Sequence, residues 1–305
     1  MIKFGVLTDI QYADKDNRNN RDYRASLEKF LEASAVFSSE KASFILQLGD
    51  VIDEEWQNFS VMIDLWEKTT SIPFRHVLGN HDLLVDNALK EKVYSSLNLP
   101  KPAYSSFILN DSTNPKNNWR FIILDGNEIA LYSAINSSEK EKAEEIRKKF
   151  KLANGKLPEE WNGAVSQTQL DWLKDQLTEA EKESQYVAIC SHFPLFFQIN
   201  SYIDNDKLSN LPVVKDIGLY LFEMGVSTWN GRAILDILDQ FSCVKVYFAG
   251  HLHEGGYGNR KNVHHLTFRG MVEASPNAYS ILELDRNNIV VHGYGTEPSA
   301  VYQIQ

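Results

Sequence analysis

The chain has 305 residues, of which 43% are hydrophobic and 24% charged, so its composition is that of a globular protein rather than a disordered or fibrous one. Its 41 acidic and 31 basic residues give a formal charge of -10. This charge argues against a broad surface for nucleic acid polymers or anionic membranes, because such partners require clustered Lys and Arg. A small anionic substrate is compatible with it if local cations offset the field. The composition does not indicate an oligomeric state.

The two cysteines, Cys190 and Cys243, each lie in an apolar run, so we expect buried thiols rather than a disulfide. The N-terminal run MIKFGVLTDIQYAD lacks the long apolar core of a signal peptide, and no stretch approaches the roughly 20 apolar residues that cross a bilayer. We therefore expect a protein of the reducing cytoplasm without a membrane partner.

Short β-rich runs alternate with helical segments, which is typical of a layered α/β fold. Apolar residues at helical spacing predict helices over 21–39 and 166–183, the second with Ser166 and Gln169 as a capping box. The charged segment 138–151 is interpreted as a surface helix. From residue 264 onward, apolar runs separated by turns predict antiparallel strands. Earlier strands are expected at 4–7, 44–48, 74–78, 121–124, 186–190 and 244–249.

The domain organisation is expected to be simple. No internal repeat and no Gly/Ser-rich or Pro-rich linker divides the chain, which favours a single domain over 1–305. The least regular stretch, 195–228, is predicted to be an inserted segment that contributes to specificity.

Potential metal ligands directly follow five of the expected strands. In α/β sheets the loops at the carboxyl ends of the strands line the binding crevice, so side chains distant in sequence converge there. A glycine at 49, 79 or 250 lets the chain turn sharply before the ligand. The side chains at these positions are Asp9 and Gln11 after FGVLT, Asp50 after FILQLG, Asn80 after FRHVLG, His192 after VAICS, and His251 and His253 after VKVYFAG.

Taken singly, each feature has an ordinary explanation. An Asp after a strand is usually a turn or capping residue, and His251 and His253 are compatible with exposed histidines. Their order is more specific: an Asp-x-His variant, Gly-Asp, Gly-Asn-His-Asp, a lone His and Gly-His-x-His together resemble the calcineurin-like metallophosphoesterases, over residues 9–253. The resemblance implies a four-layer αββα sandwich in which two central mixed sheets are flanked by helices.

The resemblance also implies a centre of two divalent metal ions. Carboxylate, amide and imidazole ligands suit Mn, Fe and Zn, and the lack of Cys ligands speaks against a structural zinc site. A hydroxide shared between the ions is then expected to attack phosphorus. The implied arrangement has Asp50 bridging both ions, Asp9 and His253 completing one, and Asn80, His192 and His251 completing the other.

Within the same motif, His81 is left free of the ions. By resemblance it protonates the leaving oxygen or stabilises the charge that develops there. Its neighbour Asp82 is expected to orient the imidazole through the other ring nitrogen.

Gln11 stands where the general pattern has His, and its amide oxygen favours an oxygen-preferring ion such as Mn. We interpret it as a weak ligand or a neighbour of the ligands, with simple packing in the turn as the alternative. Together with FGVLTDIQYAD, RDYRASLE, WNGAVSQTQLDWL, TWNGRAILDIL and FAGHLHEGGYG, it gives the chain a resemblance to the manganese-dependent ADP-ribose/CDP-alcohol diphosphatases. That family hydrolyses the phosphoanhydride of small nucleotide diphosphates such as ADP-ribose and CDP-choline, which implies Mn as the cofactor, with Fe or Zn as alternatives.

Substrate contacts are predicted from residues near these motifs. Arg18 and Arg21 are candidates for a second phosphate, with an exposed helix start as the alternative. Tyr257 lies in the glycine-rich run 255–258, which is equally compatible with an ordinary turn. Aromatic residues in and beside 195–228 are predicted to form a base-binding wall, with packing of the inserted segment as the alternative. They are Phe196, Phe197, Tyr202, Tyr220, Phe222 and Trp229.

Two other functions are compatible with the sequence. The same metal centre serves a hydrolase of cyclic nucleotides or other phosphodiesters, because fold alone does not fix the substrate. A non-catalytic interaction module that has lost its metals is less compatible, because every expected ligand type and His81 are present.

Overall fold

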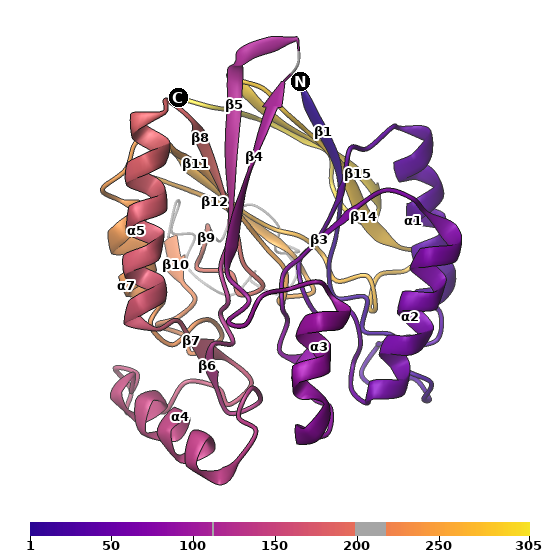
Figure 1. Ribbon diagram of the computed structural model, residues 1–305, viewed down its shortest axis with the longest axis vertical. Coiled ribbons are helices and arrows are strands. Elements are labelled where there is room, and N and C mark those ends of the chain that lie inside the picture. Colours follow the sequence, from indigo (N-terminus) through magenta and orange to yellow (C-terminus); the bar gives the residue numbers. More distant parts are fainter. Residues whose placement is uncertain (112, 199–217) are drawn as a thin grey trace, which may run out of the picture.

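Two mixed β-sheets lie face to face in the middle of the molecule, and helices cover the outer face of each (Figure 1). The computed structural model describes residues 1–111, 113–198 and 218–305. Helices α1 (Ser26–Ser39) and α2 (Trp56–Thr69) lie on one side, and α5 (Gln167–Lys182) and α7 (Gly231–Leu238) on the other. This order of layers confirms the expected αββα sandwich.

The first sheet has six strands and is parallel in one half only. β1 pairs in parallel with β2, and β2 with β3, whereas β1 meets β14 antiparallel and β14, β15 and β16 continue antiparallel. The C-terminal strands therefore form the expected antiparallel unit. In spatial order the strands are β16 (Ala300–Gln303), β15 (Asn288–Gly295), β14 (Ala278–Leu284), β1 (Ile2–Leu7), β2 (Ile45–Gln47) and β3 (Phe74–His76).

The second sheet also has six strands. Its centre is parallel, because β11 pairs in parallel with both β8 and β13, and β8 pairs in parallel with β5. Its edges, β12 and β4, are antiparallel to their neighbours. In spatial order the strands are β12 (Gly256–Arg260), β13 (Val263–Thr267), β11 (Val244–Ala249), β8 (Tyr186–Cys190), β5 (Asn114–Ile123) and β4 (Ser105–Asp111).

Smaller elements lie outside the main layers. Helices α3 and α4 lie at the end of the molecule opposite the two chain termini (Figure 1). Two short ribbons, β6 with β7 and β9 with β10, are antiparallel. Their bounds are α3 (Lys90–Ser96), α4 (Ser137–Lys149), β6 (Ile129–Ala130), β7 (Gly163–Ala164), β9 (Phe196–Gln198) and β10 (Gly218–Tyr220), with 3-10 turns η1 (His81–Leu83) and η2 (Asn87–Leu89).

Aromatic rings fill the space between the two sheets. Phe4 of β1 stacks on Phe44 with ring centroids 4.7 Å apart. It also meets Phe121 of β5 and Phe248 of β11 edge-on, at 5.6 and 6.3 Å. Phe4 is fully buried, and separate buried clusters join each sheet to its helices. The contact between the sheets therefore depends on a small group of large side chains.

The expected elements are confirmed in kind, and their boundaries differ locally. The first helix begins at Ser26 rather than at 21, because residues Arg18 and Arg21 form an isolated bridge ahead of it. Ser166 caps α5 by accepting from the Gln169 backbone NH at 3.1 Å. The Gln169 side chain does not return this bond and instead contacts Asp125 and Glu128, so only half of the capping box forms. The charged surface helix is confirmed as α4.

Three further expectations concern the whole chain. Cys190 and Cys243 are free and buried, as expected. Within the described ranges, none of the helices combines the length and the apolar character that a membrane crossing requires. The predicted inserted segment 195–228 is described only at its two ends, where β9 and β10 pair with each other. Its central part, including Tyr202, lies outside the described residues.

Replacing Phe4 by Ala should lower the free energy of unfolding by about 3–5 kcal/mol, because the ring bridges both sheets and its loss leaves a cavity. Ile108→Ala, on edge strand β4 with 45% of the residue exposed, should change it by only about 0.5 kcal/mol. Denaturant unfolding followed by fluorescence measures both. Equal losses in the two variants would contradict this account of the core.

Candidate metal centre and active site

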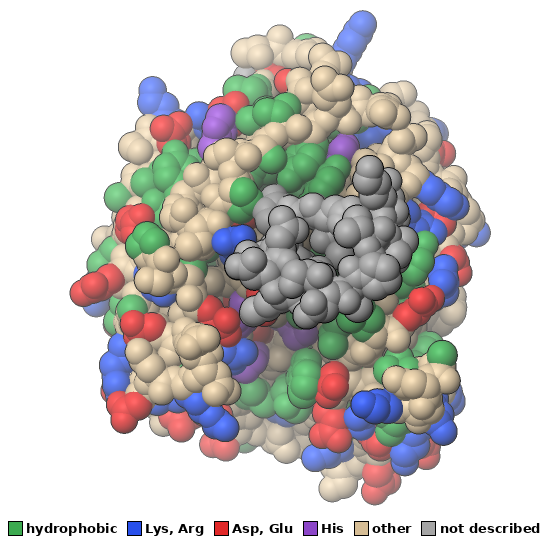
Figure 2. Space-filling model, turned by 180° about the vertical axis from the view of Figure 1, so that it is seen from behind, with side chains coloured by type: hydrophobic (Ala, Val, Ile, Leu, Met, Phe, Trp, Pro, Cys, Tyr) green, Lys and Arg blue, Asp and Glu red, His purple; other side chains and the backbone are tan. Residues whose placement is uncertain are grey.

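The polar side chains that follow the parallel strands lie together at one end of the two sheets. Histidine side chains reach the surface near the centre of the face shown in Figure 2. A cavity of about 350 Å³ opens here, which we call the central cavity. The described residues that line it are Gln11, Arg21, Asp50, Asn80, His81, Leu84, Tyr132, Trp161, Val226, His251, Leu252 and His253.

Asp9 is the centre of a first group of polar contacts. Its Oδ2 accepts hydrogen bonds from Thr8 Oγ1 at 2.7 Å and from the His251 backbone NH at 2.9 Å. Its Oδ1 lies 3.2 Å from His253 Nε2. On the far side of that imidazole, His253 Nδ1 lies 2.9 Å from Glu273 Oε1. A carboxylate on the outer nitrogen of a histidine fixes the ring and directs the other nitrogen inward, as in metal sites.

Asp50 is the centre of a second group. Its Oδ2 lies 3.3 Å from His192 Nε2 and accepts from Gln11 Nε2 at 3.0 Å. His192 Nε2 also lies 3.1 Å from Asn80 Oδ1 and 3.3 Å from His251 Nδ1. One ligand atom from each of Asp50, His192 and His251 falls within 4.8 Å of the others. Gln11 joins the two groups, because its Nε2 is also 3.3 Å from His253 Nε2.

The backbone under these side chains is held in an uncommon conformation. Asp9, Gln11, Asp50 and His251 have φ values of 49°, 43°, 57° and 70°, in the left-handed region that non-glycine residues rarely adopt. At Gly79 an added Cβ would overlap both the backbone and the carboxylate of Asp50, so only glycine fits. Such strain is typical of functional sites that the surrounding structure over-determines.

Buried charge governs the protonation of this cluster. Asp9 and Asp50 are fully buried. Burial lowers the pKa of His192, but Asp50 more than offsets this and raises it to about 9. Burial also lowers the pKa of His253, but Asp9 and Glu273 more than offset this effect and raise it to about 10. Burial and the neighbouring His192 lower the pKa of His251 to about 3, which leaves a neutral imidazole.

These residues fit a pair of divalent cations. Two protonated imidazoles act as counter-charges for the buried carboxylates, which is a role that metal ions fill when they displace the protons. Gln11 Oε1 is a buried oxygen without a hydrogen-bond partner among the described residues, and Asp9 Oδ1 has the ion pair with His253 as its contact. Oxygen and imidazole donors of this kind suit Mn, Fe and Zn. The predicted set of ligands is therefore brought together in one place.

His81 has a different partner from the one expected. Its Nδ1 lies 2.9 Å from the carbonyl oxygen of Asp53 and 2.9 Å from the Asp53 carboxylate. Burial lowers the pKa of His81, but Asp50 and Asp53 outweigh it, so the net shift is upward. The prediction that Asp82 orients His81 is therefore wrong, and Asp53 occupies that place. Asp53 lies three residues after Asp50 in the string GDVID, which is the signal that could have identified it.

Asp82 instead holds the backbone that carries the ligands. Its carboxylate accepts from the amides of Asp50 at 3.1 Å, Val51 at 2.8 Å and Gly79 at 2.9 Å. Burial and the charge of Asp50 raise the pKa of Asp82 to about 7, while the amide donors act in the opposite direction. The residue thus fastens the turn after β2 to the turn after β3.

Of the two predicted phosphate-binding arginines, only Arg21 lines the central cavity. Its Nε lies 3.3 Å from Glu273, and its Nη1 lies 3.6 Å from Asp53. It therefore links the carboxylate behind His253 to the carboxylate behind His81. Arg18 is exposed and is absent from that lining, because its segment turns back at the bridge with Arg21.

The structure places the predicted aromatic contacts with substrate outside the lining of the central cavity. Phe196 is 5% exposed and packs against Tyr220 and His265, with ring centroids 5.4 and 5.5 Å away. Tyr257 stacks on Tyr302 at 4.5 Å. Neither lines the central cavity, because both rings pack against their own neighbours. Of the remaining predicted wall, Phe222 and Trp229 are buried, whereas Phe197 and Tyr220 are partly buried and likewise absent from the cavity lining.

Sequence reasoning missed other residues of the cavity. Trp161, 40% exposed, and Tyr132 contribute aromatic surface to its wall. Trp161 belongs to the string WNGAV, whereas no sequence motif marks Tyr132 or Glu273. These positions are recognised only from the folded chain.

A family model for the calcineurin-like phosphoesterases matches residues 2–255. The chain belongs to this family. The matched range contains every side chain of the two polar groups except Glu273. The protein is therefore a metal-dependent hydrolase of phosphoester or phosphoanhydride bonds.

Relatives within the family align along nearly the whole chain. Proteins named manganese-dependent ADP-ribose/CDP-alcohol diphosphatase from Xenopus laevis and Homo sapiens are 28% and 26% identical to it. The alignments cover 96% and 99% of this chain, and 87% and 92% of those proteins. A dimetal phosphatase from Danio rerio superposes with a TM-score of 0.77 at 21% identity, covering 100% of this chain and 99% of that one. The fold is therefore shared over the full length.

Replacing Asp53 by Asn should lower kcat for a generic phosphodiester by roughly a hundredfold, the lower end of what a positioned acid or base contributes. The reason is that His81 loses the carboxylate that raises its pKa. Asp14→Asn, which removes a more exposed carboxylate paired with Arg24, should leave kcat unchanged. Steady-state kinetics with Mn measure both variants. An unchanged kcat in Asp53→Asn would rule out this role.

Proposed function

We propose that the protein hydrolyses the phosphoanhydride of ADP-ribose, CDP-choline or a related small nucleotide diphosphate, and that it uses two divalent ions with Mn as the natural choice. One observation carries the proposal: Gln11 stands in the metal cluster, touching both Asp50 and His253, within a chain that aligns end to end with enzymes of that name. The amide of Gln11 favours an oxygen-preferring ion. Such substrates are small and anionic, which agrees with a cluster that binds cations.

The two groups of contacts would supply ligands to two ions. Bound there, divalent cations would neutralise charge on the phosphoryl oxygens and lower the pKa of water. By resemblance to the family, Asp50 would be shared by both ions. Its Oδ2 contacts His192 and Gln11, and Gln11 in turn contacts His253 of the first group. Asp9 and His253 would complete one set, with Gln11 beside it, and Asn80, His192 and His251 would complete the other.

The protein's own side chains orient the substrate and move a proton. His81 lines the central cavity, and its Nδ1 is held by Asp53, so Nε2 is the ring nitrogen left to give a proton to the leaving oxygen. Arg21 holds Asp53 and Glu273 in place and adds positive charge to the same wall. Asp82 keeps Asp50 and His81 at a fixed spacing, because it binds the amides beneath the turns that carry them.

Replacing Asp50 by Asn should weaken binding of Mn by at least about tenfold and lower kcat by roughly a hundredfold or more, because both ions lose a shared charged ligand. Metal content after dialysis and turnover of ADP-ribose are the measurements. Asp64→Asn, on the surface of α2 with 69% of its side chain exposed, is the control. It should retain both the metal content and the turnover of the wild-type protein. Full activity in Asp50→Asn would contradict the assignment.

The substrate class is tested by a panel of ADP-ribose, CDP-choline and cyclic AMP with Mn, Mg or Zn. We expect the two diphosphates to be cleaved to monophosphates, and faster with Mn than with Mg or Zn. Turnover of the cyclic diester alone would assign the protein to the phosphodiester hydrolases instead. A protein that binds no metal and cleaves none of the three would be a non-catalytic module.

A further inference from the structure

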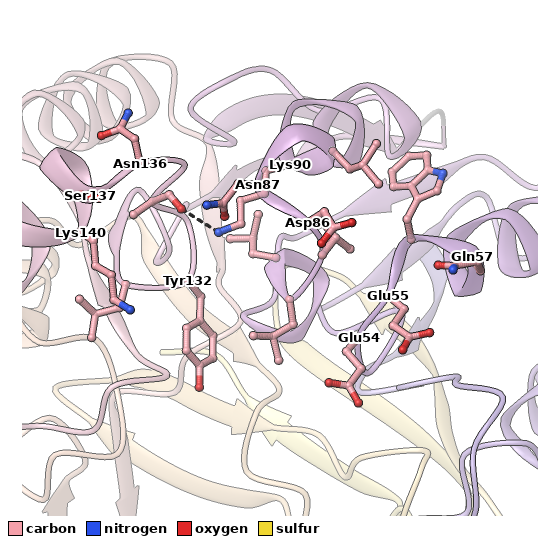
Figure 3. Close-up of a pocket in the computed structure, with 17 residues that line it drawn as sticks. Glu54, Glu55, Gln57, Asp86, Asn87, Lys90, Tyr132, Asn136, Ser137 and Lys140 are labelled. Atoms are coloured by element: carbon pink, nitrogen blue, oxygen red, sulfur yellow. Dashed lines mark hydrogen bonds between the residues drawn. The ribbon is translucent and has the colours of Figure 1, made fainter.

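A second and larger cavity adjoins the central one (Figure 3). Its volume is about 860 Å³, against about 350 Å³ for the central cavity, and we call it the side cavity. Leu84 and Tyr132 line both, so the two spaces meet at these side chains. The central cavity alone is near the lower limit of ligand pockets, which span about 300–1,000 Å³. A diphosphate with an organic group at each end must therefore extend beyond it.

The side cavity has a wall fixed by the fold. It lies between the start of α2, the turn η2 with the start of α3, and the start of α4. Lys90, at the start of α3, is 6% exposed, and its Nζ donates to the carbonyl oxygen of Ala134 at 2.8 Å (Figure 3). This bond ties α3 to the segment that precedes α4. The cavity therefore exists before any ligand arrives.

Its lining is rich in hydrogen-bonding groups. Figure 3 shows Glu54 and Glu55 on one side, and Asn136, Ser137 and Lys140 on the other. Carboxylates accept from hydroxyl groups, and amides and hydroxyls both donate and accept. The aromatic rings of Trp56 and Tyr132 add flat apolar surface. Acceptors, amides and rings together suit a sugar or another polyol, which has polar edges and an apolar face.

Asp86 and Asn87 also line the side cavity, and their side chains are available to a ligand. Asp86 makes no capping bond to η2. Among the described residues, neither Asp86 nor Asn87 forms a side-chain hydrogen bond or ion pair, although both line the cavity. Glu54 is paired with Lys15 at 2.7 Å, which leaves the carboxylates of Glu55 and Asp86 against the ammonium groups of Lys90 and Lys140. The charges of the lining therefore balance, which suits an uncharged occupant.

We infer that the side cavity binds the non-nucleoside arm of the substrate, and that this arm is an uncharged, hydroxyl-bearing group such as a sugar. The inference rests on the proposed function, since it places one end of a diphosphate whose middle lies at the metal cluster. Binding energy from such a remote arm positions the reacting phosphate and selects among substrates.

The test compares two substrates that share the nucleoside and the diphosphate. ADP-ribose carries the hydroxyl-bearing arm, and the methyl ester of ADP on its terminal phosphate lacks it. The double variant Asp86→Ala/Asn87→Ala should raise KM for ADP-ribose roughly five- to tenfold, as expected for the loss of one or two hydrogen bonds, and leave the methyl ester unchanged. Ser137→Trp, which fills the cavity from the side of α4, should do the same. Asp175→Ala, an exposed residue of α5, is the control and should change neither.

Each other outcome overturns the inference in a distinct way. Unchanged KM values in both cavity variants overturn it and leave the proposed function standing. Equal increases for both substrates show that the variants act on a part that the two share, the nucleoside or the diphosphate at the metal cluster, and not on the arm. A larger increase for CDP-choline than for ADP-ribose assigns the cavity to a cationic arm instead. If the wild-type protein cleaves neither compound, the proposed function fails, and this inference with it.

Discussion

The structure depends on the burial of two carboxylates, Asp9 and Asp50, at the end of a double sheet. Removing a carboxylate from water is costly unless it gains hydrogen bonds and positive charge. Each of the two accepts a backbone amide and a side-chain donor, and each lies beside an imidazole whose pKa is raised. The buried negative charge therefore favours the binding of cations to the cluster, which agrees with the metal-dependent chemistry of the family.

The same arrangement also requires a strained backbone. Residues held at positive φ cost on the order of 1–3 kcal/mol each, and four of them lie in the cluster. Hydrogen bonds between neighbouring turns offset the strain: the Asp9 amide binds the Gly49 carbonyl at 3.0 Å, and the Gln11 amide binds the Asp50 carbonyl at 3.0 Å. The turns after β1 and β2 thus hold each other, and Asp82 adds the turn after β3. Parallel strands make such interlocking possible because their carboxyl ends are adjacent.

The sequence predicts the metal cluster well because every ligand follows a strand, and the strand fixes where that side chain lies. Prediction fails where a role is set by neighbours in space. Asp82 adjoins His81 in the chain, yet its side chain turns to the amides below, and Asp53 reaches the imidazole from the previous loop. Phe196 and Tyr257 follow ligands closely in sequence, but apolar packing decides their orientation. Glu273 carries no sequence signal, since nineteen residues of strand and turn separate it from His253.

Chemistry and selectivity are therefore located on different parts of the chain. The residues of the metal cluster come from the ends of β1, β2, β3, β8 and β11, which the core of both sheets holds in place. The side cavity comes from the starts of α2, α3 and α4, which lie beyond those strand ends. Among the described residues, it has Leu84 and Tyr132 in common with the central cavity. Changes in the residues that line the side cavity can alter which substrate arm fits without disturbing the buried carboxylates of the metal cluster. That separation explains in physical terms why one metal centre can serve many phosphoesters while the loops around it select among them.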